Sequence, residues 1–185
     1  MAQDLMLDLE TLDTSPTSVV LTFGAVKFDK FSEKDPDDSS AIYLRLDMDE
    51  QSALGRTINP DTIEWWGKQS KESQEEAFSE ENRISLDDFT TQLNKYIVGV
   101  NDIYAHGTTF DIVILENLYR MLGKPIPWNY WQIRDSRTLF SLIGDPRPKN
   151  NLDAHNALAD AYHQARGVQQ VFKELGMLGV NRKNI

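Results

Sequence analysis

Four acidic residues and one histidine stand in three separated segments of the chain, and their side chains have the chemistry to hold metal ions. Asp8 and Glu10 are two residues apart in an apolar stretch, Asp111 follows a loop that contains glycine, and His155 and Asp160 lie toward the C-terminal end. Carboxylate oxygens are the ligands that Mg²⁺ and Mn²⁺ prefer in proteins. Two such ions side by side can clamp the attacking and leaving oxygens of a phosphodiester bond during its cleavage. The sequence therefore suggests a two-metal site for phosphodiester chemistry.

The local structure expected around these residues would turn them toward one place. Side chains alternate along a strand, so Asp8 and Glu10 would share one face, about 6–7 Å apart. Asp111 would stand at a helix N-terminus, where the helix dipole stabilises a carboxylate. His155 and Asp160 are five residues apart, about 140° around a regular helix. We therefore expect the histidine in or just before the first turn, over the site that Asp160 lines. Each segment alone would also fit an ordinary solvated strand end or helix start, so the prediction rests on all three together.

The hydrophobic pattern predicts an α/β domain with a mixed β-sheet flanked by α-helices, in the order β-β-β-α-β-α-β-α. Strands are expected over residues 4–9, 19–28, 41–46, 102–106 and 133–135, the last of them buried. Three helices are expected to begin at Asp61, Thr109 and His155, and two more directly after the capping residues Ser85 and Ser136. Asn151 or Asp153 is expected to cap the helix that begins at His155. Residues 70–83 are expected to be partly helical and exposed.

The composition fits one globular domain over residues 1–185, with 40% hydrophobic and 26% charged residues. The chain has no cysteine, which excludes a disulfide framework and a thiolate metal site. No apolar run reaches the length of a membrane span, and no basic segment precedes the first apolar stretch, so we expect a cytoplasmic protein that does not contact a membrane. The net charge of −10 disfavours a protein that coats nucleic acid. It still permits an enzyme that acts on one strand end, because bound metal ions can supply local positive charge.

Three motifs together carry a resemblance to a known family. They are Asp8-Leu9-Glu10-Thr11, Gly107-Thr108-Thr109-Phe110-Asp111 and His155-x-Ala157-x-x-Asp160. In this order and spacing, which cover nearly the whole chain, they resemble the DEDD superfamily of 3′-5′ exonucleases, which has a ribonuclease-H-like fold. The histidine five residues before the last aspartate is similar to the DEDDh branch, whereas the tyrosine branch would have tyrosine where this chain has Asn156. One departure is Gly107, where many relatives carry asparagine. Residues 60–70 and 134–138 look like segments of a bacterial and phage subgroup that includes polyadenylate-type exoribonucleases and phage DNA exonucleases.

The resemblance implies a mechanism with two divalent ions, Mg²⁺ or Mn²⁺. Asp8 would bridge both ions, Glu10 and Asp160 would complete the first site, and Asp111 would serve the second. His155 would act as the general base that takes the proton from the attacking water. A free imidazole has a pKa near 6.5, so activity would fall below about pH 6.5. The product would be a nucleoside 5′-monophosphate released from the 3′ end of single-stranded DNA or RNA.

Several further residues are expected to bind the substrate. Thr11 and Leu12 follow the first motif and could contact the terminal nucleotide, and Phe110 belongs to the second motif. Trp65 or Trp66 could stack on a base, a contact worth roughly 1–3 kcal/mol; adjacent tryptophans fit a core position and a half-exposed position equally well. The cationic candidates for phosphate contacts are Arg137, Lys68, Arg134 and Lys149. Arg134 and Arg137 fit equally well as partners of structural carboxylates such as Asp135.

Two alternative functions follow from the same residues. The first is a non-catalytic nucleic-acid-binding module, against which the complete set of acidic residues argues. The second is a phosphodiesterase with the same site that prefers short oligonucleotides. The residues do not separate DNA from RNA, since one contact to a 2′-hydroxyl would decide this, and we favour DNA slightly. A homodimer is compatible with the sequence, because some relatives are dimers, but no residue pattern requires it.

Overall fold

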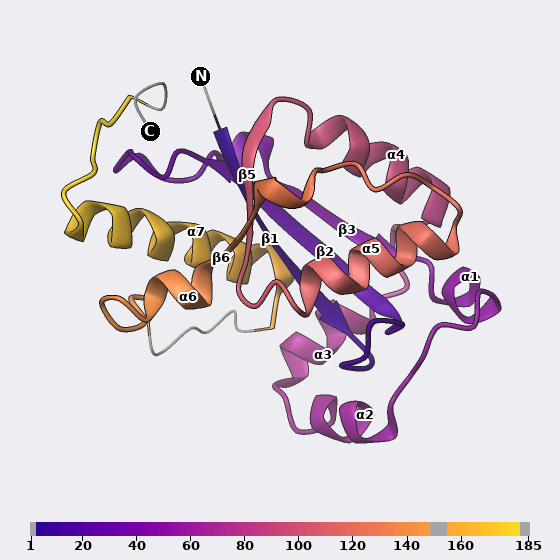
Figure 1. The fold of residues 1–185 in the computed structure, drawn as a ribbon. Helices are drawn as coiled ribbons and strands as arrows, with labels where there is room; N and C mark the ends of the chain where they lie inside the picture. The colour runs from indigo at the N-terminus through magenta and orange to yellow at the C-terminus, as the bar shows by residue number, and fades with distance from the viewer. Residues whose placement is uncertain (1–2, 149–154, 182–185) are drawn as a thin grey trace.

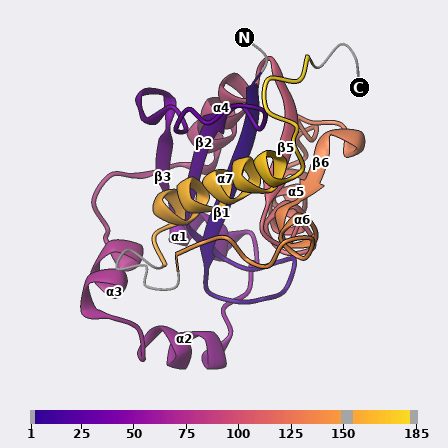
Figure 2. The same cartoon turned by 90° about the vertical axis from the view of Figure 1, so that its left-hand side faces the viewer.

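The chain folds into a mixed β-sheet with helices on both faces, which confirms the predicted α/β class (Figure 1). The computed structural model describes residues 3–148 and 155–181. The sheet has six strands in the order β4-β3-β2-β1-β5-β6. The pair β1–β2 is antiparallel and the pair β1–β5 is parallel, so the two types of pairing meet at β1. Figure 2 shows α7 lying across one face of the sheet, over β1 and β2.

The elements have the following bounds. The strands are β1 (Gln3–Thr11), β2 (Val20–Phe28), β3 (Ile42–Leu46), β4 (Arg83–Ile84), β5 (Val100–Ala105) and β6 (Ile133–Asp135). The helices are α1 (Met48–Ala53), α2 (Pro60–Trp66), α3 (Lys71–Phe78), α4 (Leu86–Tyr96), α5 (Asp111–Met121), α6 (Ser136–Phe140) and α7 (Ala157–Glu174), with short 3₁₀ turns η1 (Asp38–Ser40) and η2 (Tyr130–Gln132).

Alternation along β1 separates the core from the polar residues of interest. Leu5, Leu7 and Leu9 are buried in a cluster with apolar side chains of α4 and α5. The intervening Met6 packs in a second cluster with α6 and α7. Because side chains of a strand alternate between faces, Asp8 and Glu10 follow Met6 onto the face that α7 covers. The packing of the apolar side chains of β1 therefore fixes the face of the sheet toward which Asp8 and Glu10 point.

The structure corrects several element boundaries. The predicted order lacks α1 and β4, because β4 has only two residues and pairs with β3 without any periodic signal of its own. The start of α1 was detectable, since Asp47 caps the backbone N–H of Glu50, a sequence signature of a helix start. Strand β6 lies at the edge of the sheet and is partly exposed, rather than buried as predicted.

Two helix caps also differ from the prediction. Asp135, not Ser136, caps α6 by accepting from the backbone N–H of Thr138 at 3.0 Å, and the Ser136 hydroxyl is buried instead and bonds to the carbonyl of Ala105. Asn156 caps α7, which begins at residue 157 rather than at 155. The predicted caps Asn151 and Asp153 lie outside the described residues.

Gly24 lets the start of α7 approach the sheet. It pairs with Asp8 across β1 and β2, and a Cβ atom at this position would lie 2.2 Å from the backbone nitrogen of Leu158 and 2.4 Å from the carbonyl oxygen of Ala157. Backbone atoms cannot rotate away as a side chain can. A glycine is therefore required where α7 crosses β2.

Gly24→Ala is accordingly expected to lower the free energy of unfolding by about 3 kcal/mol, because α7 must move off the sheet. For a chain of this size the melting temperature would fall by about 6–12 °C, measurable by calorimetry. Gly67→Ala is the matched control, since a Cβ at Gly67 would lie 3.3 Å from its nearest neighbour and its φ of −59° suits alanine. Equal melting temperatures for the two variants would contradict this account.

No helix within residues 3–148 and 155–181 is long and apolar enough to cross a membrane.

Candidate active site

A cavity of about 790 Å³ opens where β1, the start of α5 and the start of α7 meet. Its lining includes the five residues that the sequence singled out for chemistry, Asp8, Glu10, Asp111, His155 and Asp160. These come from three segments more than forty residues apart along the chain, so only the fold brings them together. β1 positions Asp8 and Glu10, the start of α5 after β5 positions Asp111, and the start of α7 positions His155 and Asp160.

Asp8 and Asp111 are each held by one hydrogen bond from a neighbouring element. Gln164 of α7 donates from Nε2 to Oδ1 of Asp8 at 2.8 Å. The backbone N–H of Leu9 donates to Oδ1 of Asp111 at 3.1 Å. Asp111 is the first residue of α5 and is buried, with 3% of its surface exposed. Each carboxylate keeps its other oxygen out of these bonds, and it can therefore bind a further ligand.

His155 and Asp160 are positioned by the turn that leads into α7. His155 has a φ of +66°, a left-handed conformation that is uncommon for residues other than glycine. In this conformation its backbone N–H donates to Oδ2 of Asp160 at 3.0 Å. Asn156 then caps the helix by accepting from the N–H groups of residues 158 and 159. The strained residue thus stands at the functional site itself, where such strain is commonly found.

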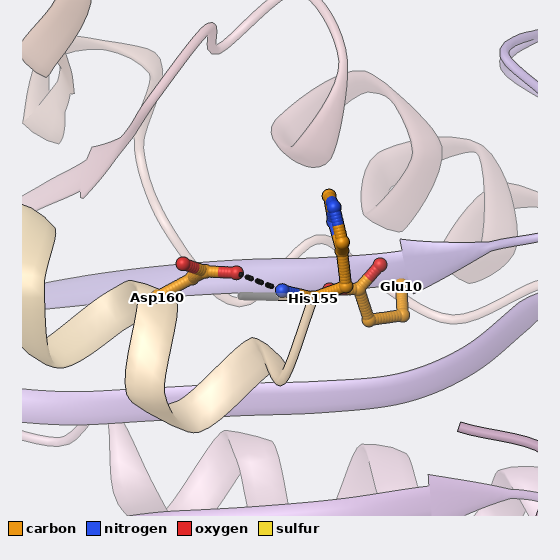
Figure 3. A group of neighbouring side chains, drawn as sticks. All are labelled: Glu10, His155 and Asp160. Carbon is orange, nitrogen blue, oxygen red and sulfur yellow. Dashed lines mark hydrogen bonds between the residues drawn. The ribbon is translucent and has the colours of Figure 1, made fainter. Parts of the chain in front are cut away.

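Glu10, His155 and Asp160 lie close to one another in the cavity (Figure 3). One ligand atom from each of the three lies within 4.8 Å of the others. The His155 ring also contacts Trp65, with ring centroids 4.8 Å apart at an angle of 84°. The sequence-based expectation of a histidine before the first turn, leaning over the site of Asp160, agrees with this geometry.

Burial raises the pKa of every carboxyl group in the cluster, and repulsion between neighbouring carboxylates raises the pKa of Asp8 and Glu10 further. The pKa of Asp8 lies well above its usual value because burial and the charges of Asp111, Glu10 and Asp160 disfavour ionisation. Burial and the charges of Asp160 and Asp111 raise the pKa of Glu10 to about 8. Burial raises the pKa of Asp111 to about 7, although hydrogen bonds and Arg137 oppose the change. Burial also raises the pKa of Asp160. Such a cluster favours binding of protons or metal cations.

The stability of the metal-free domain is therefore expected to fall between about pH 4 and pH 8. A carboxyl group titrates near pH 4 in the unfolded chain, whereas Glu10 and Asp111 keep their protons up to about pH 8 and pH 7 in the folded chain. Over this window the unfolded chain binds fewer protons than the folded chain, so rising pH favours unfolding. The stabilising carboxylates with lowered pKa values, such as Asp13 at about 2, have completed their titration below this window.

Melting temperatures in EDTA and in Mn²⁺, at pH 5 and pH 8, test this prediction. Mn²⁺ should raise the melting temperature at pH 8 by about 5–10 °C at a hundred times its Kd, and by less at pH 5, where protons compete. A monovalent salt at equal ionic strength is the control. A metal-free melting temperature that rises steadily from pH 5 to pH 8 would refute the proposed electrostatics.

The predicted substrate contacts divide between the cavity and the core. Thr11, Trp65, Phe110 and Arg137 line the cavity. Trp65 is 41% exposed, whereas Trp66 is 2% exposed and donates from its indole N–H to the carbonyl of Thr11 at 2.9 Å. Leu12 is buried beside Trp66 in a core cluster. The structure therefore does not bring Leu12 or Trp66 to the cavity.

The other cationic candidates lie away from the cavity lining. Lys68 pairs with Glu64 on the exposed side of α2, at 2.7 Å. Arg134 pairs with Asp102 at 2.9 Å and also donates to the carbonyls of residues 131 and 133, so it has the structural role considered above. Lys149 lies outside the described residues.

The sequence analysis missed several cavity residues, among them Gln164, His106 and Arg147. Gln164 was detectable, because it stands four residues after Asp160 and so on the same side of the helix. It is buried, and its Oε1 has no hydrogen-bond partner among the residues that the structure describes. Arg147 follows α6 in an irregular segment, where no periodicity predicts the direction of a side chain.

Comparison with known proteins identifies the chain. A family model described as the 3′-5′ exoribonuclease Rv2179c-like domain matches residues 3–172. The chain belongs to this family. The description of this family names a 3′-5′ exonuclease domain, the class that the three motifs predicted. No curated protein sequence matches the chain.

Solved structures of three nucleases share the fold of this exonuclease domain. Cell-death related nuclease 4 (CRN-4) has a TM-score of 0.65 and 14% identity, over 95% of this chain and 65% of its own. Exonuclease I of E. coli in complex with single-stranded DNA has a TM-score of 0.60 and 16% identity, over 95% of this chain and 43% of its own. The nuclease domain of 3′hExo, a DEDDh family member bound to rAMP, has a TM-score of 0.56 and 13% identity, over 97% and 96% of the two chains. The chain thus spans less than two thirds of the first two proteins, and the likeness confirms the expected ribonuclease-H-like fold.

Proposed function

We propose that this domain removes nucleotides one at a time from the 3′ end of single-stranded RNA. In this proposal Asp8, Glu10, Asp111 and Asp160 hold two divalent ions, Mg²⁺ or Mn²⁺, and His155 is the general base. The convergence of these five side chains in one cavity is the observation that carries the proposal. Nucleoside 5′-monophosphates are the expected products.

The residues present fit divalent ions. Their donors are hard oxygen ligands, and four carboxylates with raised pKa values supply the negative charge that such ions require. The unpartnered Oε1 of Gln164 adds a neutral acceptor next to Asp8. When bound, the ions supply positive charge that stabilises the phosphate in the transition state. Gln164 and the Leu9 N–H orient Asp8 and Asp111 for this role.

The position of His155 beside the cluster of carboxylates supports its proposed role as the proton acceptor. Its ring nitrogen lies within 4.8 Å of carboxylate oxygens of Glu10 and Asp160. The left-handed backbone and the bond to Asp160 hold the residue outside the helix, so its ring faces the cavity. The edge-on contact with Trp65 restricts the rotation of the ring. A water molecule attacking the terminal phosphodiester would lose its proton to this imidazole.

The remaining cavity residues suit the terminal nucleotide. Trp65 offers an exposed indole face for a base, a contact that does not depend on base identity. Thr11 and Phe110 line the same cavity from β1 and from the loop before α5. The homodimer that the sequence allows stays a prediction.

RNA as the substrate is favoured by the family description, which names an exoribonuclease, and it replaces the slight preference for DNA drawn from the sequence. The structures with similar folds hold single-stranded DNA in one protein and rAMP in another.

The test is the rate of mononucleotide release from matched RNA and DNA strands with Mn²⁺, together with an RNA whose last nucleotide alone is 2′-deoxy. Faster release from RNA, lost with the single 2′-deoxy substitution, is expected. Equal rates on all three strands would contradict RNA selectivity, and cleavage of dinucleotides alone would favour the phosphodiesterase alternative.

A further inference from the structure

One wall of the cavity is basic, although the chain as a whole is acidic. Arg137 of α6 and Arg147 of the segment after α6 line the same cavity as the carboxylate cluster. Trp65 lines it from α2, and α2 and α6 lie well apart in both views of the fold (Figures 1 and 2). The cavity therefore has an aromatic side and a basic side, with the carboxylates lining it as well.

The guanidinium group of Arg137 occupies the space left by the missing side chain of Gly107. A Cβ at Gly107 would lie 3.2 Å from Nη2, 3.6 Å from Cζ and 3.8 Å from Nε of Arg137. The guanidinium also donates to the carbonyl of His106 at 3.1 Å. Gly107 is the position at which this chain departs from the asparagine of many relatives. The departure therefore has a structural counterpart, which is an arginine lying over the backbone of the loop before α5.

The charge of Arg137 remains available to a ligand. Within residues 3–148 and 155–181, no carboxylate lies within ion-pair distance of its guanidinium. By contrast, Arg134, three residues earlier, is paired with Asp102. An unpaired guanidinium beside a cavity is well suited to bind a phosphate through two parallel hydrogen bonds.

Arg147 is fixed by a chain of hydrogen bonds anchored in the sheet. Its Nη2 lies 3.1 Å from Nε2 of His106, whose pKa is lowered to about 4 by burial and by both arginines. The neutral imidazole can therefore accept from Arg147 through Nε2, while its Nδ1 lies 3.1 Å from the hydroxyl of Ser136. That hydroxyl donates to the carbonyl of Ala105 in β5 at 3.2 Å. Asp145 binds Nε and Nη2 of Arg147, and Nη1 takes no part in any of these bonds.

We infer that Arg137 and Arg147 form a phosphate subsite that holds a second phosphate of the substrate strand, next to the phosphodiester that is cleaved. The carboxylates and the ions that they hold would take the scissile phosphate, and the basic wall would take its neighbour. This inference rests on the proposed function. Its consequence is that the enzyme should prefer substrates with at least two phosphates.

Three short RNA substrates separate the two phosphates. A dinucleotide with a 5′-hydroxyl has only the scissile phosphodiester, a 5′-phosphorylated dinucleotide adds a terminal phosphate, and a trinucleotide adds an internal one. Wild-type kcat/KM should be at least tenfold higher for a substrate with a second phosphate. The substrate that shows the higher kcat/KM identifies whether a terminal or an internal phosphate fills the subsite.

Arg137→Gln and Arg147→Gln should each reduce this gain about tenfold, mainly through KM, and Arg137→Lys should restore part of it. The salt dependence of KM for the trinucleotide should weaken, with the log–log slope changing by about 0.7 for each lost contact. Arg134→Gln is the matched control, because the same residue type is removed from the same region but outside the cavity. An unchanged gain in both variants, or an equal loss on all three substrates, would overturn the subsite. A wild-type enzyme that cleaves none of the three would instead count against the proposed function.

Discussion

Asp8→Asn is expected to reduce exonuclease activity by on the order of 10³-fold or more, because several kcal/mol of transition-state stabilisation depends on the ions that Asp8 would help to hold. The same substitution should raise the melting temperature of the metal-free domain at pH 8. Asp8 lies among Glu10, Asp111 and Asp160, and its charge is disfavoured in the folded state. The asparagine can still accept the bond from Gln164. Loss of function and gain of stability should therefore coincide.

Asp13→Asn is the matched control, which is expected to destabilise the fold. Hydrogen bonds from Thr57, Ser15 and Thr14 lower the pKa of Asp13 to about 2, so its charged form stabilises the fold at every pH above its usual titration range. Calorimetry in EDTA at pH 8 should show a higher melting temperature for Asp8→Asn and a lower one for Asp13→Asn. An Asp8→Asn variant that is active, or that melts below the wild type in EDTA, would contradict the account of the carboxylate cluster.

His155→Asn is expected to reduce kcat by 10²–10⁴-fold, the range typical for removal of a general base. The backbone N–H of residue 155 would still bind Asp160, so the turn before α7 should be kept. His163→Asn is the control, because His163 lies on α7, where it contacts Tyr162 and does not line the cavity. The melting-temperature shift caused by Mn²⁺ gives a second readout, since a general base can be lost without loss of metal binding. A His155→Asn variant with more than half of wild-type kcat would contradict the assigned role.

The parts of the site that belong to regular elements were predictable from the sequence. Asp8 and Glu10 follow from strand alternation, and Asp111 follows from its place between a strand and a helix. The position of His155 before the first turn of α7 followed from its spacing to Asp160, although its left-handed backbone conformation did not. These features depend on local geometry, which the sequence pattern carries.

The parts that depend on tertiary contacts were not predictable. Trp65 and Trp66 are adjacent and chemically identical, and only tertiary contacts distinguish them. Trp66 packs in a core cluster and donates to the carbonyl of Thr11. The need for Gly24 arises from the crossing of α7, which is more than one hundred residues away in sequence. Arg147 and His106 line the cavity in contact with each other, and neither residue stands in a recognisable motif. Long-range packing of this kind leaves no periodic signal in the chain.

A time course on a strand labelled at its 5′ end, with Mn²⁺ or with EDTA, tests the central claim most directly. The account predicts a ladder that shortens by one nucleotide at a time from the 3′ end in Mn²⁺ and an intact strand in EDTA. Fragments from internal cleavage, or equal degradation in EDTA, would contradict a metal-dependent 3′-5′ exonuclease centred on Asp8, Glu10, Asp111, His155 and Asp160.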